Sequence, residues 1–137
     1  MTSGRLALRS DWYRRDIDSG FDLDLPGIYE WRIEGVGIYV GKALRLKRRL
    51  AHYPNNVRRM LQDLPWHGNP NRDYRGIHHA LRRAYEHQIV TSVAVLETCS
   101  REARSEREQY WIRQRRAEQA TGGPKVLNAE LGRTGSE

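Results

Sequence analysis

The sequence predicts an α+β domain with a small antiparallel or mixed sheet of three strands flanked by helices. Two short segments with strand character, residues 27–34 and 37–42, are joined by the turn-forming sequence Glu-Gly-Val-Gly. A later segment, 89–98, is rich in β-branched residues. Around these segments, apolar residues recur at helical spacing. The length of 137 residues fits one domain.

Residues 1–25 mix charged and apolar groups without a regular period, so we expect an N-terminal arm that packs on the domain. Its candidate anchors are Trp12, Ile17, Phe21 and Leu23. Pro26 then prevents a helix and opens the first strand. The alternation of a strand predicts that Tyr29, Trp31 and Ile33 share one face of the sheet.

A helix is expected after the second strand, and its core stripe consists of Ala43, Leu46, Leu50 and Tyr53. Pro54 is expected to end it. We then expect a helical insertion at about 55–88 that begins with a short helix over 55–64. A loop follows at 65–71, because it holds two prolines and a glycine. The second helix of the insertion starts near Tyr74 and has a strongly basic outer face.

The segment 89–98 is predicted to be a buried central strand. Ser100 is expected to cap a helix that runs to about residue 120, where Gly122, Gly123 and Pro124 end it. Val126 and Leu127 should return to the core and place Asn128 at its rim. The domain is therefore expected to span residues 26–131, followed by a flexible tail at 132–137.

The charge of the chain indicates an anionic partner. Lys and Arg number 24 and Asp and Glu number 17, a formal net charge of +7, which favours binding to phosphates. No apolar run approaches the roughly 20 residues that cross a bilayer, and the N-terminus lacks an apolar signal core. We therefore expect a cytoplasmic protein without a membrane partner. Its oligomeric state is open.

Cysteine and histidine give little sign of a metal site. The single cysteine, Cys99, excludes an intramolecular disulfide and is expected to be a buried structural thiol. His78 and His79 are adjacent on a predicted helix and point in different directions, so they do not bind one ion together. A zinc site that uses His67 or Cys99 is therefore disfavoured.

Four motifs follow one another between residues 27 and 128. The first is the pair Gly27-Ile28-Tyr29 and Tyr39-Val40-Gly41, and the second is Arg49 with Tyr53 four residues later. The third is Glu108-Gln109-Tyr110-Trp111-Ile112, and the fourth is Leu127-Asn128. In this order they resemble the GIY-YIG endonuclease domain. Val40 stands where the family name has Ile, and Tyr53 stands where many members have His.

The resemblance implies hydrolysis of phosphodiester bonds in DNA with Mg²⁺ or Mn²⁺ as cofactor. It implies that Glu108 binds the metal, that Arg49 stabilises charge on the phosphoryl oxygens, and that Tyr29 is the general base. Tyr39 would hydrogen-bond the attacking water or the phosphate. Tyr53 would complete the network, and Asn128 would orient Glu108 or the waters of the metal. A carboxylate oxygen is a ligand that Mg²⁺ prefers.

The residues themselves set a condition on this mechanism. A free phenol has a pKa of about 10, so Tyr29 acts as a base at neutral pH only if a nearby positive charge favours the phenolate. Lys42 is the candidate for that charge. Gly41 would let the protein backbone pass close to the substrate without a side chain in the way. The expected contacts to phosphates are Arg45, Arg48, His52, Arg58, Arg59, Arg75, Arg82 and Arg83.

Two alternatives stay open. Basic charge does not imply catalysis, so the chain is alternatively a nucleic-acid-binding module on the same scaffold that does not cut. RNA is also open as the substrate. Site preference has no sequence signal, and we expect weak specificity unless a partner supplies it. The nuclease hypothesis requires that Tyr29, Tyr39, Arg49 and Glu108 meet in one pocket with room for a hydrated cation.

Overall fold

The computed structural model describes residues 11–69, 73–129 and 131 of the chain. Its strands are β1 (Arg14–Asp16), β2 (Gly27–Ile33), β3 (Gly37–Ala43) and β4 (Thr91–Thr98). Its α-helices are α1 (Leu46–Leu61), α2 (Gly76–Glu86) and α3 (Arg104–Ala120), and a short 3-10 helix, η2, covers Trp66–Gly68. The predicted tail at 132–137 lies outside the described residues.

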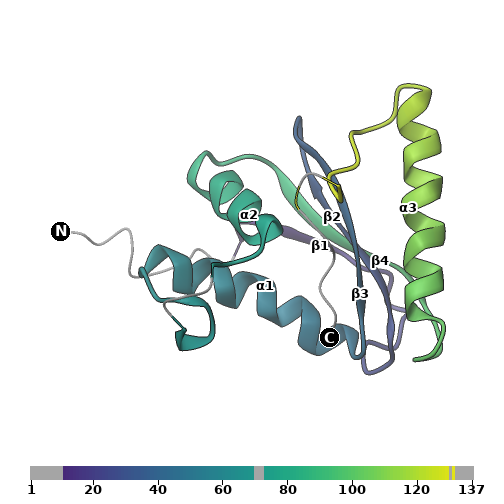
Figure 1. Ribbon diagram of the computed structural model, residues 1–137, viewed down its shortest axis with the longest axis horizontal. Helices are drawn as coiled ribbons and strands as arrows, with labels where there is room; N and C mark the ends of the chain where they lie inside the picture. Colours follow the sequence, from purple (N-terminus) through teal and green to yellow (C-terminus); the bar gives the residue numbers. More distant parts are fainter. Residues whose placement is uncertain (1–10, 70–72, 130, 132–137) are drawn as a thin grey trace.

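The fold is α+β with three layers. A mixed sheet of four strands in the order β1-β4-β2-β3 forms the middle layer, with α1 and α2 on one face and α3 on the other (Figure 1). β4 is parallel to β1 and antiparallel to β2, which is antiparallel to β3. The segment predicted as a central strand is therefore an interior strand, and β3 is an edge strand.

The sequence predicts three strands, and the structure has a fourth. This strand, β1, lies in the predicted N-terminal arm, and its residues Arg14, Arg15 and Asp16 are all exposed. It carries neither an apolar run nor an alternating pattern, so sequence patterning does not reveal it. Residues 1–10 of the predicted arm lie outside the described residues. The four expected anchors are confirmed, because Trp12 is buried in the core and Ile17, Phe21 and Leu23 pack against it.

The predicted hairpin is present, with β2 and β3 paired from Gly27 and Ala43 to Ile33 and Gly37. Gly35, in the turn, has a φ of +74°, a conformation that favours glycine. Alternation divides the strand residues between two cores. The larger core, under α1 and α2, contains Tyr29, Trp31, Ile33 and Tyr39. The smaller core, under α3, contains Ile28, Ile38, Val40, Ile112 and Val126.

The prediction that Pro54 ends its helix is wrong, because α1 continues to Leu61. A proline inside a helix removes one hydrogen bond and costs about 3 kcal/mol. Beyond it, Val57 and Met60 are buried, and each buried apolar side chain contributes roughly 1.5 to 3 kcal/mol. Burial thus outweighs the cost of the proline. The first part of the predicted insertion is the second half of α1.

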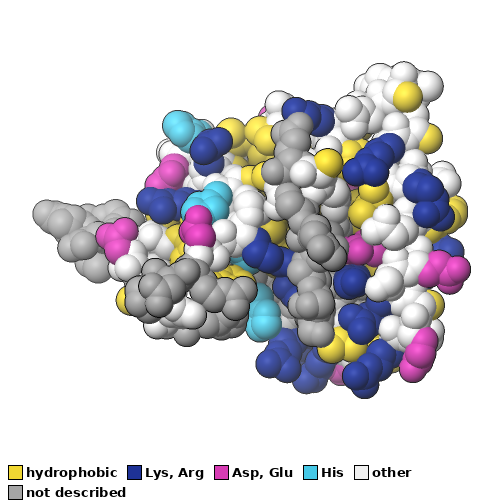
Figure 2. Space-filling view, in the orientation of Figure 1, with side chains coloured by type: hydrophobic (Ala, Val, Ile, Leu, Met, Phe, Trp, Pro, Cys, Tyr) yellow, Lys and Arg dark blue, Asp and Glu magenta, His cyan; other side chains and the backbone are white. Residues whose placement is uncertain are grey.

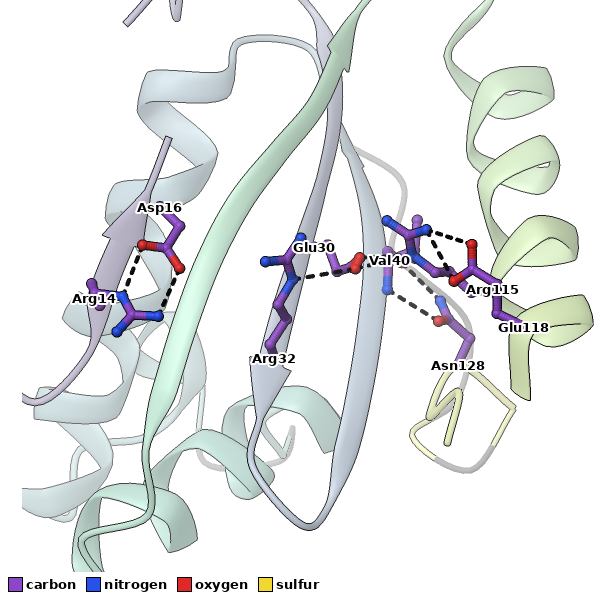
Figure 3. Close-up of polar contacts among 8 residues, drawn as sticks. All are labelled: Arg14, Asp16, Glu30, Arg32, Val40, Arg115, Glu118 and Asn128. Carbon is purple, nitrogen blue, oxygen red and sulfur yellow. Dashed lines mark hydrogen bonds and ion pairs between the residues drawn. The ribbon is translucent and has the colours of Figure 1, made fainter. Parts of the chain in front are cut away.

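The last helix contacts the sheet through charged groups as well as through the smaller apolar core. In α3 only Glu108 and Ile112 are buried. Arg115 donates from Nε to both carboxylate oxygens of buried Glu30 on β2, at 2.9 and 3.1 Å. Arg115 also pairs with Glu118, and Arg32 lies 3.5 Å from Glu30 (Figure 3). Ion pairs therefore supply much of the contact that holds α3 on the sheet.

Two smaller expectations need correction. Ser100 accepts a hydrogen bond from the Ala103 N–H at 3.2 Å, so it caps the turn before α3, which itself begins at Arg104. Cys99 is a free thiol that is half-buried and not fully buried. In the described part of the chain, no helix has the length and apolar character needed to cross a membrane.

The Arg115–Glu30 pair yields a test of this packing. The substitution Arg115→Met keeps a long apolar side chain but leaves the carboxylate of Glu30, 2% exposed, without its main partner. Removal of one partner from such a pair should lower the free energy of unfolding by about 3 kcal/mol, measured by urea denaturation. The control is Arg113→Met, on the exposed side of α3. Equal losses in the two variants would contradict the packing role.

Candidate active site

Three tyrosines from three elements meet beside the edge strand β3. The hydroxyl oxygens of Tyr29 on β2 and Tyr53 on α1 share a hydrogen bond. Their ring centroids are 5.6 Å apart in an edge-to-face arrangement. Tyr39, on β3, lies close to the other two phenols. Negative charge on Tyr53 raises the pKa of Tyr39, and negative charge on Tyr39 raises the pKa of Tyr29. All three side chains are buried.

Gly41 makes room for this cluster. It is the partner of Tyr29 in the β2–β3 register, and the ring of Tyr29 lies across it. A Cβ atom at position 41 would stand 2.4 Å from both Cζ and the hydroxyl oxygen of Tyr29. Gly41 is itself buried. The missing side chain at position 41 thus makes room for the tyrosine ring, and the predicted approach to substrate at Gly41 stays a prediction.

Two arginines direct their charge at the phenols. Arg49, on α1, is half-buried, and its charge acts to lower the pKa of Tyr29 and of Tyr39. Arg75 donates from Nη2 to the hydroxyl oxygen of Tyr53 at 3.3 Å. The prediction that Arg75 faces outward on a basic helix is wrong, because it is the N-cap residue of α2. A residue before a helix does not follow the periodicity of the helix.

A carboxylate reaches the same cluster from the opposite layer. Glu108 lies on α3, and its negative charge raises the pKa of Tyr39. The structure thus brings together the phenols of Tyr29 and Tyr39, the guanidinium of Arg49 and the carboxylate of Glu108. Glu108 itself is buried, with 2% of its surface exposed.

Two cavities of the described residues lie away from this cluster. One, of about 280 Å³, lies between β1 and the end of α2 and is lined by residues such as Trp12, Tyr85 and Thr91. The other, of about 310 Å³, lies between the hairpin and α3 and includes Glu30 and Arg115. Neither of these two cavities is lined by the phenols.

Lys42 does not accompany Tyr29. Its side chain lies on the α3 side of the sheet, where Nζ donates to Ser105 Oγ at 3.0 Å. Strand alternation accounts for this position, because Gly41 is the residue opposite Tyr29 and its neighbour points to the other face. The expectation for Lys42 is therefore wrong, and Arg49 is the cation that acts on Tyr29.

Both strand tyrosines are protonated at neutral pH in this conformation. Burial raises the pKa of Tyr29 well above 10, and Tyr53 adds to the increase, while Arg49 opposes it. Burial likewise raises the pKa of Tyr39, with Tyr53 and Glu108 adding to it and Arg75 and Arg49 opposing it. The condition set by the sequence, a phenol whose pKa is lowered by a cation, is not met while the phenols are buried.

Asn128 is engaged with the backbone of β3. Its Oδ1 accepts from the Val40 N–H at 3.1 Å, and its Nδ2 donates to the Val40 carbonyl at 2.8 Å (Figure 3). Next to it, Val126 forms a parallel bridge with Ile38. The amide therefore extends the ladder of the sheet, and this buried position does not support the predicted role in orienting Glu108.

The predicted phosphate contacts are spread over several environments. Arg45, Arg48, Arg58 and Arg83 are exposed, and His52, Arg59 and Arg82 are half-buried. Several already have protein partners: Arg45 binds Asp24, Arg82 binds Glu86, Arg58 binds Asn55 and Arg59 donates to the Pro65 carbonyl. α1 contains no acidic residue. Lys and Arg side chains also gather along α3 and at the lower end of the sheet (Figure 2).

His78 is a site neighbour that sequence patterning did not single out. It is 1% exposed, its Nε2 lies 3.2 Å from Asn56 Nδ2, and its ring centroid lies 5.1 Å from that of Tyr53. Burial lowers its pKa to about 3, with help from Arg75 and Arg49. As expected, His79 points elsewhere, within 3.0 Å of Asp73.

The donor atoms at the site fit a hydrated Mg²⁺ better than a fully enclosed ion. Among the described residues, no group of three or more His, Cys, Asp or Glu is placed to hold a metal. Glu108 alone offers a carboxylate beside the phenols, and Mg²⁺ commonly binds one or two carboxylates while it keeps several waters. An ion reaches this carboxylate only if the site opens.

No protein-family model, curated protein or solved structure matches this chain. The likeness to GIY-YIG endonucleases therefore rests on the order of the motifs and on the cluster of side chains described above.

Substitution of Gly41 tests the geometry of the phenol cluster. In Gly41→Ala, the new methyl group must displace the ring of Tyr29, which is buried and 2% exposed. Overpacking of this kind should lower the free energy of unfolding by about 1 to 3 kcal/mol, measured by urea denaturation. Gly20→Ala is the control, since its nearest atom is an exposed Asp18 oxygen at 3.3 Å. An equally stable Gly41→Ala variant would contradict the close approach.

The low pKa of His78 predicts a dependence of stability on pH. The pKa of His78 in the folded state, about 3, lies below the ordinary 6.5. Neutral His78 therefore contributes fully to the stability of the fold above pH 6.5, and this contribution is lost as pH falls towards 3. His78→Gln should remove about 3 kcal/mol of the loss that wild type shows between pH 7 and 4, measured by denaturation at each pH. In the control, His79→Gln, the loss should be unchanged. Parallel profiles for His78→Gln and wild type would refute the assignment.

Proposed function

We propose that this protein is a metal-dependent endonuclease of the GIY-YIG type that hydrolyses phosphodiester bonds in DNA. The observation that supports it is the convergence of Tyr29, Tyr39, Arg49 and Glu108, which come from four elements and both faces of the sheet. Phenols, guanidinium groups and a carboxylate are costly to bury unless they interact. Their meeting at one point of the fold favours a functional role.

Each group has a part in the proposed hydrolysis. Tyr29, as phenolate, takes a proton from water while the water oxygen forms a bond to phosphorus and the bond to the departing oxygen breaks. The departing oxygen then takes a proton from solvent. Arg49 stabilises the negative charge that builds on the phosphoryl oxygens. Glu108 would hold Mg²⁺, which supplies Lewis-acid stabilisation of that charge when bound.

The burial of the site residues sets a requirement for this function. The phenols and Glu108 are buried, and the pKa of Tyr29 is raised, so cleavage requires that these groups become accessible and that added positive charge, such as that of a bound Mg²⁺, offsets the charge of the phosphate. The exposed cations of α1, Arg48 and Arg58 among them, are suited to bind the phosphate backbone. DNA is the proposed polymer, and RNA is tested beside it.

A second candidate function is a nucleic-acid-binding module that keeps the scaffold and does not cut. The burial of Glu108 and the raised pKa values of Tyr29 and Tyr39 favour it, because both features oppose metal binding and base catalysis. The two candidates share the basic surface and differ in turnover. Cleavage assays therefore separate them where binding assays do not.

Glu108→Gln is the test of the proposed function. With Mg²⁺ or Mn²⁺, nicking of a supercoiled plasmid should fall at least about 100-fold, because the amide is a poorer metal ligand and loses the negative charge. DNA binding in the absence of divalent metal should be retained. The matched control is Glu106→Gln, on the exposed side of the same helix, and its rate should equal that of wild type.

Three outcomes decide between the candidates. A wild-type protein that binds DNA and cleaves neither duplex DNA nor structured RNA is the binding module. Cleavage of structured RNA alone would change the substrate class. A Glu108→Gln variant that cuts as fast as wild type would remove the metal role assigned to this carboxylate.

A further inference from the structure

The hydrogen bonds at the centre of the site have a direction. A guanidinium has N–H donors and no acceptor, so Arg75 donates to the hydroxyl oxygen of Tyr53, at 3.3 Å. The same oxygen shares a hydrogen bond with the hydroxyl of Tyr29. The hydroxyl hydrogen of Tyr53 does not point at Arg75. Among the described residues, the oxygen of Tyr29 is the acceptor that remains for it.

Burial makes this direction important. Tyr53 and Tyr29 are 0% and 2% exposed, so water does not supply a further acceptor to either hydroxyl, and the bond between them uses only one of the two hydroxyl hydrogens. The hydrogen bond from Arg75 to the oxygen of Tyr53 makes the Tyr53 hydroxyl the stronger donor of the two, because hydrogen bonds in a chain polarise one another. If Tyr53 donates to Tyr29, the oxygen of Tyr29 is the accepting end of a chain that runs from Arg75 through Tyr53. An oxygen in that position is suited to carry negative charge and to receive a proton.

The backbone at Arg75, the first donor of this series of hydrogen bonds, is held in place. Arg75 is extended, with φ −69° and ψ 158°, and its carbonyl accepts the first-turn N–H of His78 at 3.0 Å. The next residue, Gly76, lies so close to the C-terminal segment that a Cβ atom there would be 2.9 Å from the Leu131 carbonyl oxygen. The backbone that carries the Arg75 side chain is therefore held by the first turn of α2 and by the close contact of Gly76 with Leu131.

The charge of Arg75 is directed at the site. In the described part of the chain it has no ion pair with a carboxylate, and its buried Nε has no hydrogen-bond partner there. Its charge acts to lower the pKa of Tyr39. The groups that face Tyr29 are Tyr53 and Arg49 from α1 and Tyr39 from β3; Arg75 reaches it through Tyr53.

We propose that Arg75 is a positioning residue of the active site: it directs the hydroxyl hydrogen of Tyr53 to Tyr29 and so makes the oxygen of Tyr29 the proton acceptor of the reaction. This proposal rests on the proposed nuclease function and adds to it a group that the sequence motifs do not contain. It replaces the earlier expectation of an outward-facing phosphate contact.

Kinetics against pH separate positioning from the other roles of an arginine. Arg75→Met keeps the side-chain length and removes the donor and the charge. It should shift the rise of kcat with pH in the alkaline direction by on the order of one pH unit, because Tyr29 then loses support for its phenolate. Arg75→Lys, which keeps one charged donor, should restore part of the shift.

The control is Arg14→Met on β1, where Arg14 is exposed and pairs with Asp16; its pH profile should match that of wild type. A phosphate contact at Arg75 predicts instead a higher KM that depends on salt, with no shift in pH. A purely structural role predicts a lower kcat by the same factor at every pH. Either of these results would overturn the proposal.

A double-mutant cycle identifies the route of the effect. If Arg75 acts through Tyr53, the alkaline shift caused by Arg75→Met should disappear in a Tyr53→Phe background, because the intervening hydroxyl is gone. A full shift in that background would mean that Arg75 acts on Tyr29 directly, and the proposed chain would be wrong.

A measurement without catalysis separates this proposal from the proposed function. Incorporation of 3,5-difluorotyrosine at position 29 gives a more acidic phenol whose titration is followed by fluorine NMR. Its midpoint should be higher in Arg75→Met than in the parent protein. If the parent cuts nothing and this difference is present, the nuclease function fails and the hydrogen-bond chain stands. Equal midpoints would refute the chain itself.

Discussion

The contact on which the site depends is the ring of Tyr29 lying across Gly41. Because position 41 has no side chain, the ring extends from β2 over the neighbouring strand, and its hydroxyl reaches Tyr53 on α1. A larger residue would force the ring upright into the core between sheet and helices. The tyrosine, the edge strand and the helix are therefore joined through one small residue, and the two arginines gather around that junction.

The carboxylate of the site depends on a different kind of contact. Besides the apolar contacts of Ile112, the position of α3 on the sheet is set by the contact of Arg115 Nε with both carboxylate oxygens of Glu30 and by the bidentate pair of Arg107 with Glu97. Ion pairs with hydrogen bonds are directional, whereas apolar contacts tolerate sliding. A helix held in this way keeps one rotation about its axis, and that rotation turns Glu108 inward.

Much of the fold is predictable from the sequence because its rules are local. Turn residues and alternation give the β2–β3 hairpin and the face occupied by Tyr29. β1 has no such signal, because its pairing with β4 is a tertiary contact made by charged residues. The prediction at Pro54 failed because apolar burial further along α1 outweighs a local rule.

The site is predictable in part for the same reason. Strand alternation places the side chain of Lys42 on the other face of the sheet from Tyr29. The prediction for Lys42 relied instead on its closeness to the Tyr39-Val40-Gly41 motif in the sequence. Arg75 precedes its helix and lies far from the motifs in sequence, so its contact with Tyr53 follows only from the packing of α2 against α1. No local sequence pattern predicts the burial of Glu108, because that burial depends on elements distant along the chain.

The pairing of Asn128 with Val40 has a consequence for the whole sheet. An edge strand offers unsatisfied amide and carbonyl groups to any other extended chain, which is a route to aggregation. On β3 the side-chain amide and the adjacent bridge at Val126 occupy these groups. The opposite edge is β1, only three residues long and charged throughout. Both ends of the sheet are thus protected against adding a strand from a second copy, one by a single asparagine and the other by brevity and charge.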